Sequence, residues 1–244
     1  MGQLTGMTVG FVLVARCRTV ALSPKGFRPQ KEVIAELYRI GLPAIVMQSL
    51  ATFMTLGLNK IMALFSSSAV FILGAYFKIQ SFIFMPVHGL NNGMIPVVGY
   101  NYGARHRARI TGLTRFALCI AVVIMAAGTL FLLCLPGFFL ALFNAEPEVL
   151  AAGVPALRMI ALSFPFAGVS IVLCAVLQAV GESLRSLAVS LARQILLVLP
   201  AALALGLLAP ERMWLCFLLS ELLSCGLALL LYRQICRQKL SRLS

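Results

Sequence analysis

The sequence predicts an all-α, polytopic membrane protein whose main body is a bundle of six transmembrane helices. Of its 244 residues, 61% are hydrophobic and only 11% are charged, and the mean hydropathy is +1.00. A soluble domain of this size has about a quarter charged residues and slightly under half apolar ones. Six long apolar runs, with basic residues gathered between them, complete the pattern. An ordinary cytosolic enzyme is therefore excluded.

Each predicted helix is an apolar run that reaches the roughly 20 residues needed to cross a bilayer core of about 30 Å. The runs cover residues 40–65, 69–98, 111–143, 149–180, 186–208 and 213–232. Turn-forming or polar segments separate them, at residues 66–68, 99–109, 144–147, 181–183 and 209–211. Several prolines lie inside the runs. Such prolines break soluble helices but are tolerated as kinks in membrane helices.

The distribution of Lys and Arg predicts the orientation of these helices. Basic residues are frequent before the first run, in the second connection (Arg105, Arg107, Arg109) and in the tail, whereas the first and third connections have none. Lys and Arg in short loops mark the cytoplasmic side. We therefore expect a multi-pass protein of the cell (plasma or inner) membrane with its linker and C-terminus in the cytoplasm. The net charge of +13 fits this pattern, so the bilayer is the expected partner and nucleic acid is not.

The chain is predicted to contain four segments. Residues 1–15 are apolar but too short to span, and their basic residues follow the run rather than precede it, the reverse of a signal peptide. We expect them to be the end of a truncated transmembrane helix. Residues 16–39 are expected to form a cytoplasmic linker with an amphipathic stretch on the membrane surface, residues 40–233 the six-helix lobe, and residues 234–244 a cytoplasmic tail.

Polar side chains recur along the first run, at Gln48, Thr52, Thr55 and Asn59. At about 100° per residue, they share an arc of roughly 40° on one helix face. Two interpretations are open: the face hydrogen-bonds to a neighbouring helix, or it lines a water-filled cavity. Methionines and aromatic residues nearby, such as Met47 and Phe53, suit a cavity that adapts to varied amphipathic ligands, although simple packing is the commoner use of such residues.

The second run is still more polar and is bent by Pro86. Its candidate cavity residues are Lys78, Gln80, Phe84, His88, Asn91 and Asn92. Each unsatisfied polar group in lipid costs several kcal/mol, so this helix must face protein or water. His88 is either a satisfied buried side chain or a proton carrier. Lys78 is either a cation in the cavity or a side chain that snorkels to the membrane surface.

Three charges lie within the later runs: Arg158, Arg193 and Glu221. A lone charge at the bilayer centre costs at least ~2.5–3.5 kcal/mol, so we expect each to have a partner or to reach an interface. Glu221, the one carboxylate inside a run, either pairs with an arginine or handles protons or cations. The seven cysteines have no metal-ligand spacing, and the sequence has no nucleophile, base or metal constellation, so no enzyme, metal or other cofactor is expected.

The second run and its connection carry the most specific motif. Residues 84–93 read F-M-P-V-H-G-L-N-N-G and residues 96–104 read P-V-V-G-Y-N-Y-G-A, followed by Arg109. This closely resembles the eighth helix and following loop of the multidrug and toxic compound extrusion (MATE) transporters, members of the MOP flippase superfamily. Gly41-Leu42-Pro43 with Gln48 and Asn59 is similar to their seventh helix, and Arg193-Gln194 to their eleventh.

The resemblance implies two six-helix lobes, of which this chain is the second, with the N-terminal lobe as a missing partner. It implies antiport of amphipathic or cationic small molecules by alternating access, driven by Na+ or H+. The family's second-lobe coupling carboxylates cannot be carried over, because the first and fourth runs have none in their interior. The coupling ion's site is therefore expected outside this chain. Two alternatives stay open: a lipid-linked oligosaccharide flippase of the same superfamily, and a non-transporting membrane fragment.

Overall fold

The protein, as a computed structural model, is described over residues 2–16 and 30–243, and within these ranges it contains only helices, turns and short connections. The chain falls into two units, Met1–Gly41 and Leu42–Ser244. The predicted all-α class is confirmed.

The first unit contains α1 (Gly2–Arg16) and the beginning of α2 (Lys31–Ala63). Apolar side chains of α1, from Leu4 to Leu13, are exposed in this unit. Of the expected linker, residues 17–29 lie outside the described part of the chain, and its last nine residues, 31–39, are helical as the first turns of α2.

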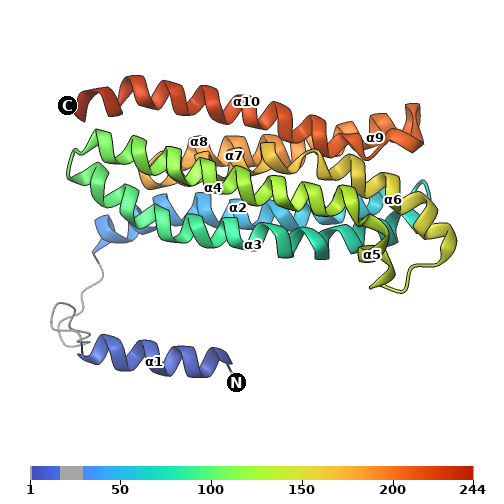
Figure 1. Ribbon diagram of the computed structural model, residues 1–244. Helices are drawn as coiled ribbons and strands as arrows, with labels where there is room; N and C mark the ends of the chain where they lie inside the picture. The colour runs from blue at the N-terminus through green and yellow to red at the C-terminus, as the bar shows by residue number, and fades with distance from the viewer. Residues whose placement is uncertain (1, 17–29, 244) are drawn as a thin grey trace. The chain divides into compact units, whose positions relative to one another are not determined.

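The second unit is a bundle of long helices (Figure 1). After the remainder of α2 it contains α3 (Ser67–Gly103), α4 (Arg107–Cys134), α5 (Pro136–Ala141), α6 (Pro147–Ala161), α7 (Phe164–Ala179), α8 (Ser183–Leu191), the π-helix η1 (Ala192–Leu197), α9 (Val198–Leu208), the 3-10 helix η2 (Pro210–Arg212), α10 (Leu215–Gln238) and the 3-10 helix η3 (Leu240–Leu243). Helix α7 lies at the centre, because it packs against α3, α4, α8 and α10.

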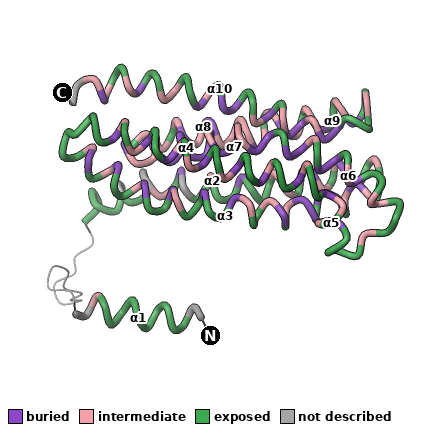
Figure 2. The backbone as a smooth tube through the Cα atoms, viewed as in Figure 1, coloured by how far each residue is buried: buried purple, intermediate pink, exposed green. Residues whose placement is uncertain are grey.

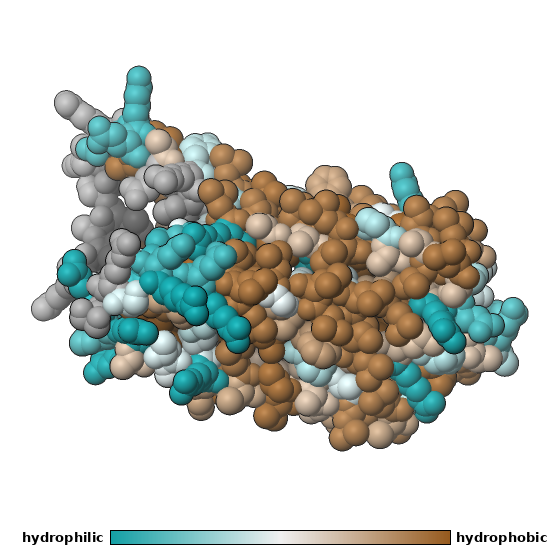
Figure 3. All heavy atoms as spheres, turned by 90° about the horizontal axis from the view of Figure 1, so that it is seen from above, coloured by the Kyte–Doolittle hydropathy of each residue, from teal (hydrophilic) through white to brown (hydrophobic). Residues whose placement is uncertain are grey.

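The bundle has the lengths and hydropathy of a membrane protein. Five helical segments of the described chain are long and apolar enough to cross a bilayer, and α6 with α7, joined at a 45° bend, count as a sixth. These correspond to the six apolar runs of the sequence. Many large apolar side chains, among them Phe116, Val123 and Leu130 of α4, are exposed. Figure 3 shows that hydrophobic side chains cover the middle of one face and hydrophilic ones gather toward its ends, and Figure 2 shows the buried residues on the inner sides of the helices.

The connection between α3 and α4 is much shorter than the segment 99–109 read as a loop in the sequence. Helix α3 continues through Gly103, and only residues 104–106 separate it from α4. The turn is closed by the His106 N–H, which donates to the Asn101 carbonyl, and Arg105 adopts a left-handed conformation with φ 59°. The glycines of the G-Y-N-Y-G string are thus helical.

Prolines place the breaks within the spans. A proline has no N–H for the carbonyl four residues before it. Helix α4 ends just before Pro136, and the bend between α6 and α7 precedes Pro165. In the fifth span, Pro200 follows the π-helix η1 and has no N–H for the Leu196 carbonyl. The wide π-helical turn lies in the middle of the span Ser183–Leu208.

Small residues let the helices approach closely. A Cβ atom at Gly128 of α4 would lie 2.3 Å from Cγ2 of Ile83 in α3, and one at Gly168 of α7 would lie 2.8 Å from Cγ of Met125 in α4. The helices that build the site described below are therefore fixed by tight packing on their outer sides.

Candidate functional site

Two adjoining cavities lie within the second unit, with volumes of about 370 and 590 Å3. They share six wall residues, from α2, α3, α7 and the π-helix: Met47, Gln48, His88, Ile171, Arg193 and Gln194. We call the smaller one the charged cavity, because Glu221 also lines it, and the larger one the amide cavity, because Asn91, Asn92 and Gln178 line it.

Helix α3 supplies one continuous wall to both cavities. Gln80, Phe84 and His88 line the charged cavity, and His88, Asn91 and Asn92 line the amide cavity. Because a helix returns to the same face after three or four residues, this spacing aligns the side chains along one side of α3. The predicted polar stacking of Gln80, Phe84, His88 and Asn91 thus corresponds to a shared cavity wall.

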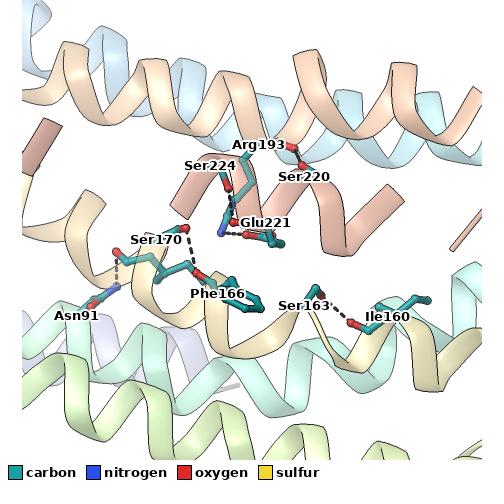
Figure 4. Close-up of polar contacts among 10 residues, drawn as sticks. Asn91, Ile160, Ser163, Phe166, Ser170, Arg193, Ser220, Glu221 and Ser224 are labelled. Carbon is teal, nitrogen blue, oxygen red and sulfur yellow. Dashed lines mark hydrogen bonds and ion pairs between the residues drawn. The ribbon is translucent and has the colours of Figure 1, made fainter. Parts of the chain in front are cut away.

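Arg193 and Glu221 form an ion pair in the charged cavity, with 3.8 Å between Arg193 Nη1 and Glu221 Oε2. The side chains are 21% and 14% exposed, respectively. At this distance the two groups attract each other but do not form a hydrogen bond of ordinary length. Figure 4 shows the side chains of Arg193, from the π-helix, and Glu221, from α10, pointing toward each other.

The π-helix is held in place from α10. The Ser220 hydroxyl donates a hydrogen bond of 2.6 Å to the Arg193 carbonyl (Figure 4). This bond satisfies a backbone acceptor at the point where the winding of the fifth span changes. Isolated π-helical turns are rare and frequently mark functional sites, and here the turn presents both Arg193 and the buried Gln194 to the cavities.

The amide cavity is organised by side-chain hydrogen bonds between helices. Asn91 Nδ2 donates to the Ile171 carbonyl of α7 at 3.3 Å (Figure 4). Gln178 Nε2 donates to the Ser186 hydroxyl at 3.0 Å. That hydroxyl in turn donates to the Met47 sulfur at 3.7 Å. These contacts connect α3 to α7, and α7 to α8 and α2.

Aromatic and thioether groups form the apolar part of the charged cavity. Tyr76 is 1% exposed and stacks edge-on with Phe217 of α10, with ring centroids 5.0 Å apart. Phe84 packs edge-on against Phe164, with centroids 5.2 Å apart. Met47, Met54 and Met85 complete the apolar wall. A mixed wall of amides, one ion pair, flat rings and flexible methionines suits an amphipathic ligand.

Several candidate residues from the sequence lie elsewhere. Thr52 lies with Gln48 on a separate shallow region of α2, while Thr55 and Asn59 bond within their own helix, with the Thr55 hydroxyl donating to the Ala51 carbonyl and Asn59 Nδ2 to the Thr55 carbonyl. Lys78 is exposed, and so are the aromatic side chains of Phe53 and Phe82.

Arg158 also lies outside both cavities. Its side chain is exposed, and Nε donates to the Leu133 carbonyl in the last turn of α4 at 3.2 Å. Carbonyls in the last turn of a helix have no helical donor, so Arg158 satisfies one of them and meets the expectation that a charge in a span finds a partner.

Sequence reasoning missed Tyr76, Ser220 and Phe217 as wall residues. A buried tyrosine in a membrane span needs a polar environment for its hydroxyl, which was a usable signal for Tyr76. Ser220 precedes Glu221 and gave no signal, because a serine in a membrane helix commonly bonds to its own backbone. Among the described residues, no group of three or more His, Cys, Asp or Glu side chains is placed to hold a metal ion.

Comparison with known proteins adds to this geometry. The MatE family model matches residues 43–203, more than half of the chain. The multidrug export protein MepA of Staphylococcus aureus (strain bovine RF122 / ET3-1) is 26% identical over 230 residues, which cover 91% of this chain and 49% of MepA. MepA of Staphylococcus haemolyticus is 25% identical over 170 residues, 67% of this chain and 36% of that protein. The chain thus spans half or less of the length of these relatives.

Solved structures share the fold at low identity. A crystal structure of a MATE protein in complex with MaL6 superposes with a TM-score of 0.87 at 20% identity, over 98% of this chain and 54% of that one. An outward-facing multidrug resistance MATE transporter of the MOP superfamily superposes with a TM-score of 0.84 at 20% identity, over 96% of this chain and 52% of that one. The family model, the relatives and the bundle agree, and the chain belongs to the MATE family of membrane transporters.

Proposed function

We propose that this chain is the C-terminal lobe of a secondary active exporter that carries amphipathic or cationic compounds out of the cell by alternating access. The observation that carries the proposal is the composition of the charged cavity. One carboxylate, Glu221, lies beside Arg193 in a wall that also contains amides, aromatic rings, methionines, serines and an imidazole. Such a wall can bind the apolar body of a cargo by adaptable contacts and its charge by the carboxylate.

Transport by alternating access needs a second lobe to move against. The relatives are at least about twice as long as the region that matches this chain. We therefore propose that a six-helix N-terminal lobe completes the cargo path. We also propose that inward flow of Na+ or H+ drives export, with the coupling site in that lobe, because the expected positions in the first and fourth spans of this chain hold no carboxylate.

The proposed orientation places the basic end of the bundle in the cytoplasm. The turn between α3 and α4 with Arg105 and Arg107, and the end of α10 with Arg233, Arg237 and Lys239, lie at the same end. The opposite end holds the connection with Glu146 and Glu148. Because Lys and Arg are retained on the cytoplasmic side during insertion, the linker and the C-terminus are proposed to be cytoplasmic.

A lipid-linked oligosaccharide flippase is disfavoured by the placement of the cations. A cavity for a lipid phosphate needs a group of unpaired arginines or lysines. Of the three candidates, Lys78 is exposed, Arg158 bonds to the end of α4, and Arg193 is paired with Glu221. The cavities therefore offer no surplus of positive charge among the described residues.

Ethidium, a fluorescent amphipathic cation, tests the proposal. We would express the chain in a bacterial strain lacking its main drug exporters, alone and together with the N-terminal half of MepA, and follow ethidium accumulation. Lower accumulation with both halves than with either half is the expected result. Equal accumulation in all strains, with both halves detected in the membrane, would favour the non-transporting fragment. The same strains with Glu221→Gln separate export through this cavity from indirect effects.

A further inference from the structure

Two hydrogen-bond acceptors in the cavity walls are buried and have no donor among the described residues. They are Oε2 of Glu221 and Oδ1 of Asn91. Glu221 lines the charged cavity and Asn91 the amide cavity, and the two cavities share the wall that contains His88 and Arg193. Two residues with an unused acceptor thus stand in the walls of two adjoining cavities.

Asn91 is 7% exposed, and its position is fixed by its own donor. Nδ2 donates to the Ile171 carbonyl on the facing helix α7. Because an amide carries its nitrogen and oxygen on the same carbon, Oδ1 cannot turn to a new donor without breaking that bond. The acceptor therefore needs a donor that enters the cavity.

Glu221 has a partner in charge but not in hydrogen bonding. Arg193 Nη1 lies 3.8 Å from Oε2, and an N–H···O hydrogen bond to a carboxylate is normally about 2.7–2.9 Å long. The carboxylate can accept several hydrogen bonds. The ion pair therefore leaves the carboxylate able to accept hydrogen bonds from a second cation that brings its own N–H groups.

We propose that the cavities select cations that carry N–H donors, such as protonated amines and amidiniums, over quaternary cations of the same size. Glu221 accepts from the cationic nitrogen, and Asn91 accepts from a second donor on a cargo long enough to reach the amide cavity. A quaternary ammonium brings charge but no N–H, so it fills the space and leaves both buried acceptors unpaired, which is the costly outcome. This inference rests on the proposed function, because it assumes that cargo occupies these cavities.

Other polar groups of the wall do not distinguish N–H cations from quaternary cations in the same way. Gln80 and Gln194 carry both donors and acceptors and can adapt to either kind of ligand. Arg193 has only donors and repels both kinds of cation equally. We therefore assign a preference for N–H among cations of equal charge and bulk to the two unpaired acceptors.

The test uses three probes with the same apolar body: 4-phenylbutylammonium, its N,N-dimethyl form and its N,N,N-trimethyl form. The dimethyl and trimethyl forms are nearly equal in bulk and charge, and differ in the one remaining N–H. Binding is measured by titration calorimetry on the full chain in lipid nanodiscs, with empty nanodiscs subtracted. We expect the dimethyl form to bind about tenfold more tightly than the trimethyl form, the usual effect of a hydrogen bond to a charged group.

Variants assign the effect to the two acceptors. Glu221→Gln is expected to bring the dimethyl and trimethyl forms to within about twofold of each other. Glu211→Gln removes a carboxylate from the exposed helix η2 outside both cavities. It should leave the ratio of the affinities for the dimethyl and trimethyl forms unchanged. For Asn91→Ala, the probe is 1,10-diaminodecane, which has an ammonium at each end. Its affinity should fall at least about threefold, while that of the dimethyl form stays the same.

Each outcome is decisive. Equal binding of the dimethyl and trimethyl forms to the unaltered chain overturns the N–H selection and leaves the export proposal standing, since the cavity still binds cations. If the affinity ratio of the dimethyl and trimethyl forms persists in Glu221→Gln, the assignment to Glu221 is overturned. If Asn91→Ala leaves diamine binding unaffected, the assignment to Asn91 is overturned. Failure of all three probes to bind counts against both the selection and the proposed cargo cavity. The probe series on the unaltered chain keeps the test valid if a variant fails to fold.

Discussion

The hydroxyl of Thr129 in α4 lies 2.9 Å from two carbonyl oxygens, that of Met125 in its own helix and that of Ala161 at the end of α6, and shares its one proton between them. The Ala161 carbonyl is the one that Pro165 leaves without its helical donor, because proline has no N–H. The neighbouring carbonyl of Ile160 accepts from the Ser163 hydroxyl at 2.6 Å (Figure 4). At the 45° bend between α6 and α7, the Thr129 hydroxyl thus serves a carbonyl without a backbone donor, while the Ser163 hydroxyl adds a second bond to the Ile160 carbonyl, which also accepts from the Ser163 N–H.

Replacing Thr129 by valine is expected to destabilise the bundle by about 1–3 kcal/mol, because it leaves the buried Ala161 carbonyl unsatisfied while keeping the side-chain shape. The measurement is reversible unfolding of the purified chain in mixed micelles. Thr129→Ser is the control, since it keeps the hydroxyl and should lose less stability against unfolding. Equal losses for valine and serine would show that packing, rather than the hydrogen bond, accounts for the role of Thr129.

Gly128 lies one residue earlier and tests the close contact between α3 and α4. Its replacement by alanine places a Cβ atom 2.3 Å from Cγ2 of Ile83, so we expect a loss of roughly 1–3 kcal/mol from overpacking. Gly226→Ala in α10 is the matched control, because a Cβ there meets nothing within 4 Å; it should be neutral or slightly stabilising.

The double variant Gly128→Ala with Ile83→Ala identifies the mechanism. Removing Cγ2 of Ile83 takes away the atom that the new Cβ meets, so the two losses should be less than additive. Strict additivity in the same unfolding assay would mean that the two side chains do not meet.

The fold class followed from the sequence because the bilayer imposes it. Only segments with internally satisfied backbones cross a membrane, so six apolar runs separated by turn residues left few alternatives. The sequence also predicted kinks at prolines inside the runs, and the bend between α6 and α7 precedes one of them, Pro165. The 45° angle was not predictable, because the sequence does not show that the Thr129 hydroxyl reaches the Ala161 carbonyl of another helix in addition to the Met125 carbonyl of its own.

The site was less predictable, because helix periodicity gives a face but not what the face meets. Gln48 and Asn59 share a face of α2, yet only Gln48 lines the cavities. The four polar residues extend along about 16 Å of helix, and the cavity walls from α3, α7, η1 and α10 meet only part of that length. Likewise, the sequence allowed Glu221 an arginine partner, but that this is Arg193 depends on how the fifth and sixth spans pack.

Arg193→Gln and Glu221→Gln are expected to affect cation binding in opposite directions. Removal of the guanidinium leaves the carboxylate without its competing partner, so binding of 4-phenylbutylammonium should tighten by about threefold to tenfold, whereas Glu221→Gln should weaken it by a similar factor. Calorimetry in nanodiscs measures both. Weakening in both variants would mean that the ion pair shapes the cavity without taking part in cation binding.

Glu182 is expected to contribute little to stability despite its two ion pairs. Its carboxylate lies 2.5 Å from Lys239 Nζ and 3.4 Å from Arg185 Nε at the basic end of the bundle, where the basic side chains are 40% and 31% exposed. Exposed pairs contribute roughly 0–1 kcal/mol and weaken with salt. Glu182→Gln should therefore lower the free energy of unfolding by about that amount in low salt. It should lower it less in about 0.5 M salt, where the Debye length is only on the order of a few ångströms and the ion pairs are screened. A loss that does not change with salt would contradict this.

Gln48 and Asn59 provide the most direct comparison of cavity and packing roles on one helix. Gln48 lines both cavities, whereas Asn59 lies outside them and donates to the Thr55 carbonyl of its own helix. Gln48→Ala should lower ethidium affinity of the full chain about threefold to tenfold, through loss of a polar wall contact, and Asn59→Ala should change it by less than about twofold. Fluorescence anisotropy on nanodisc samples, normalised to folded protein, measures both. If Asn59→Ala weakened binding as much as Gln48→Ala, the whole polar face of α2 would contact cargo, and the cavities would have to extend further along the helix when a ligand is bound.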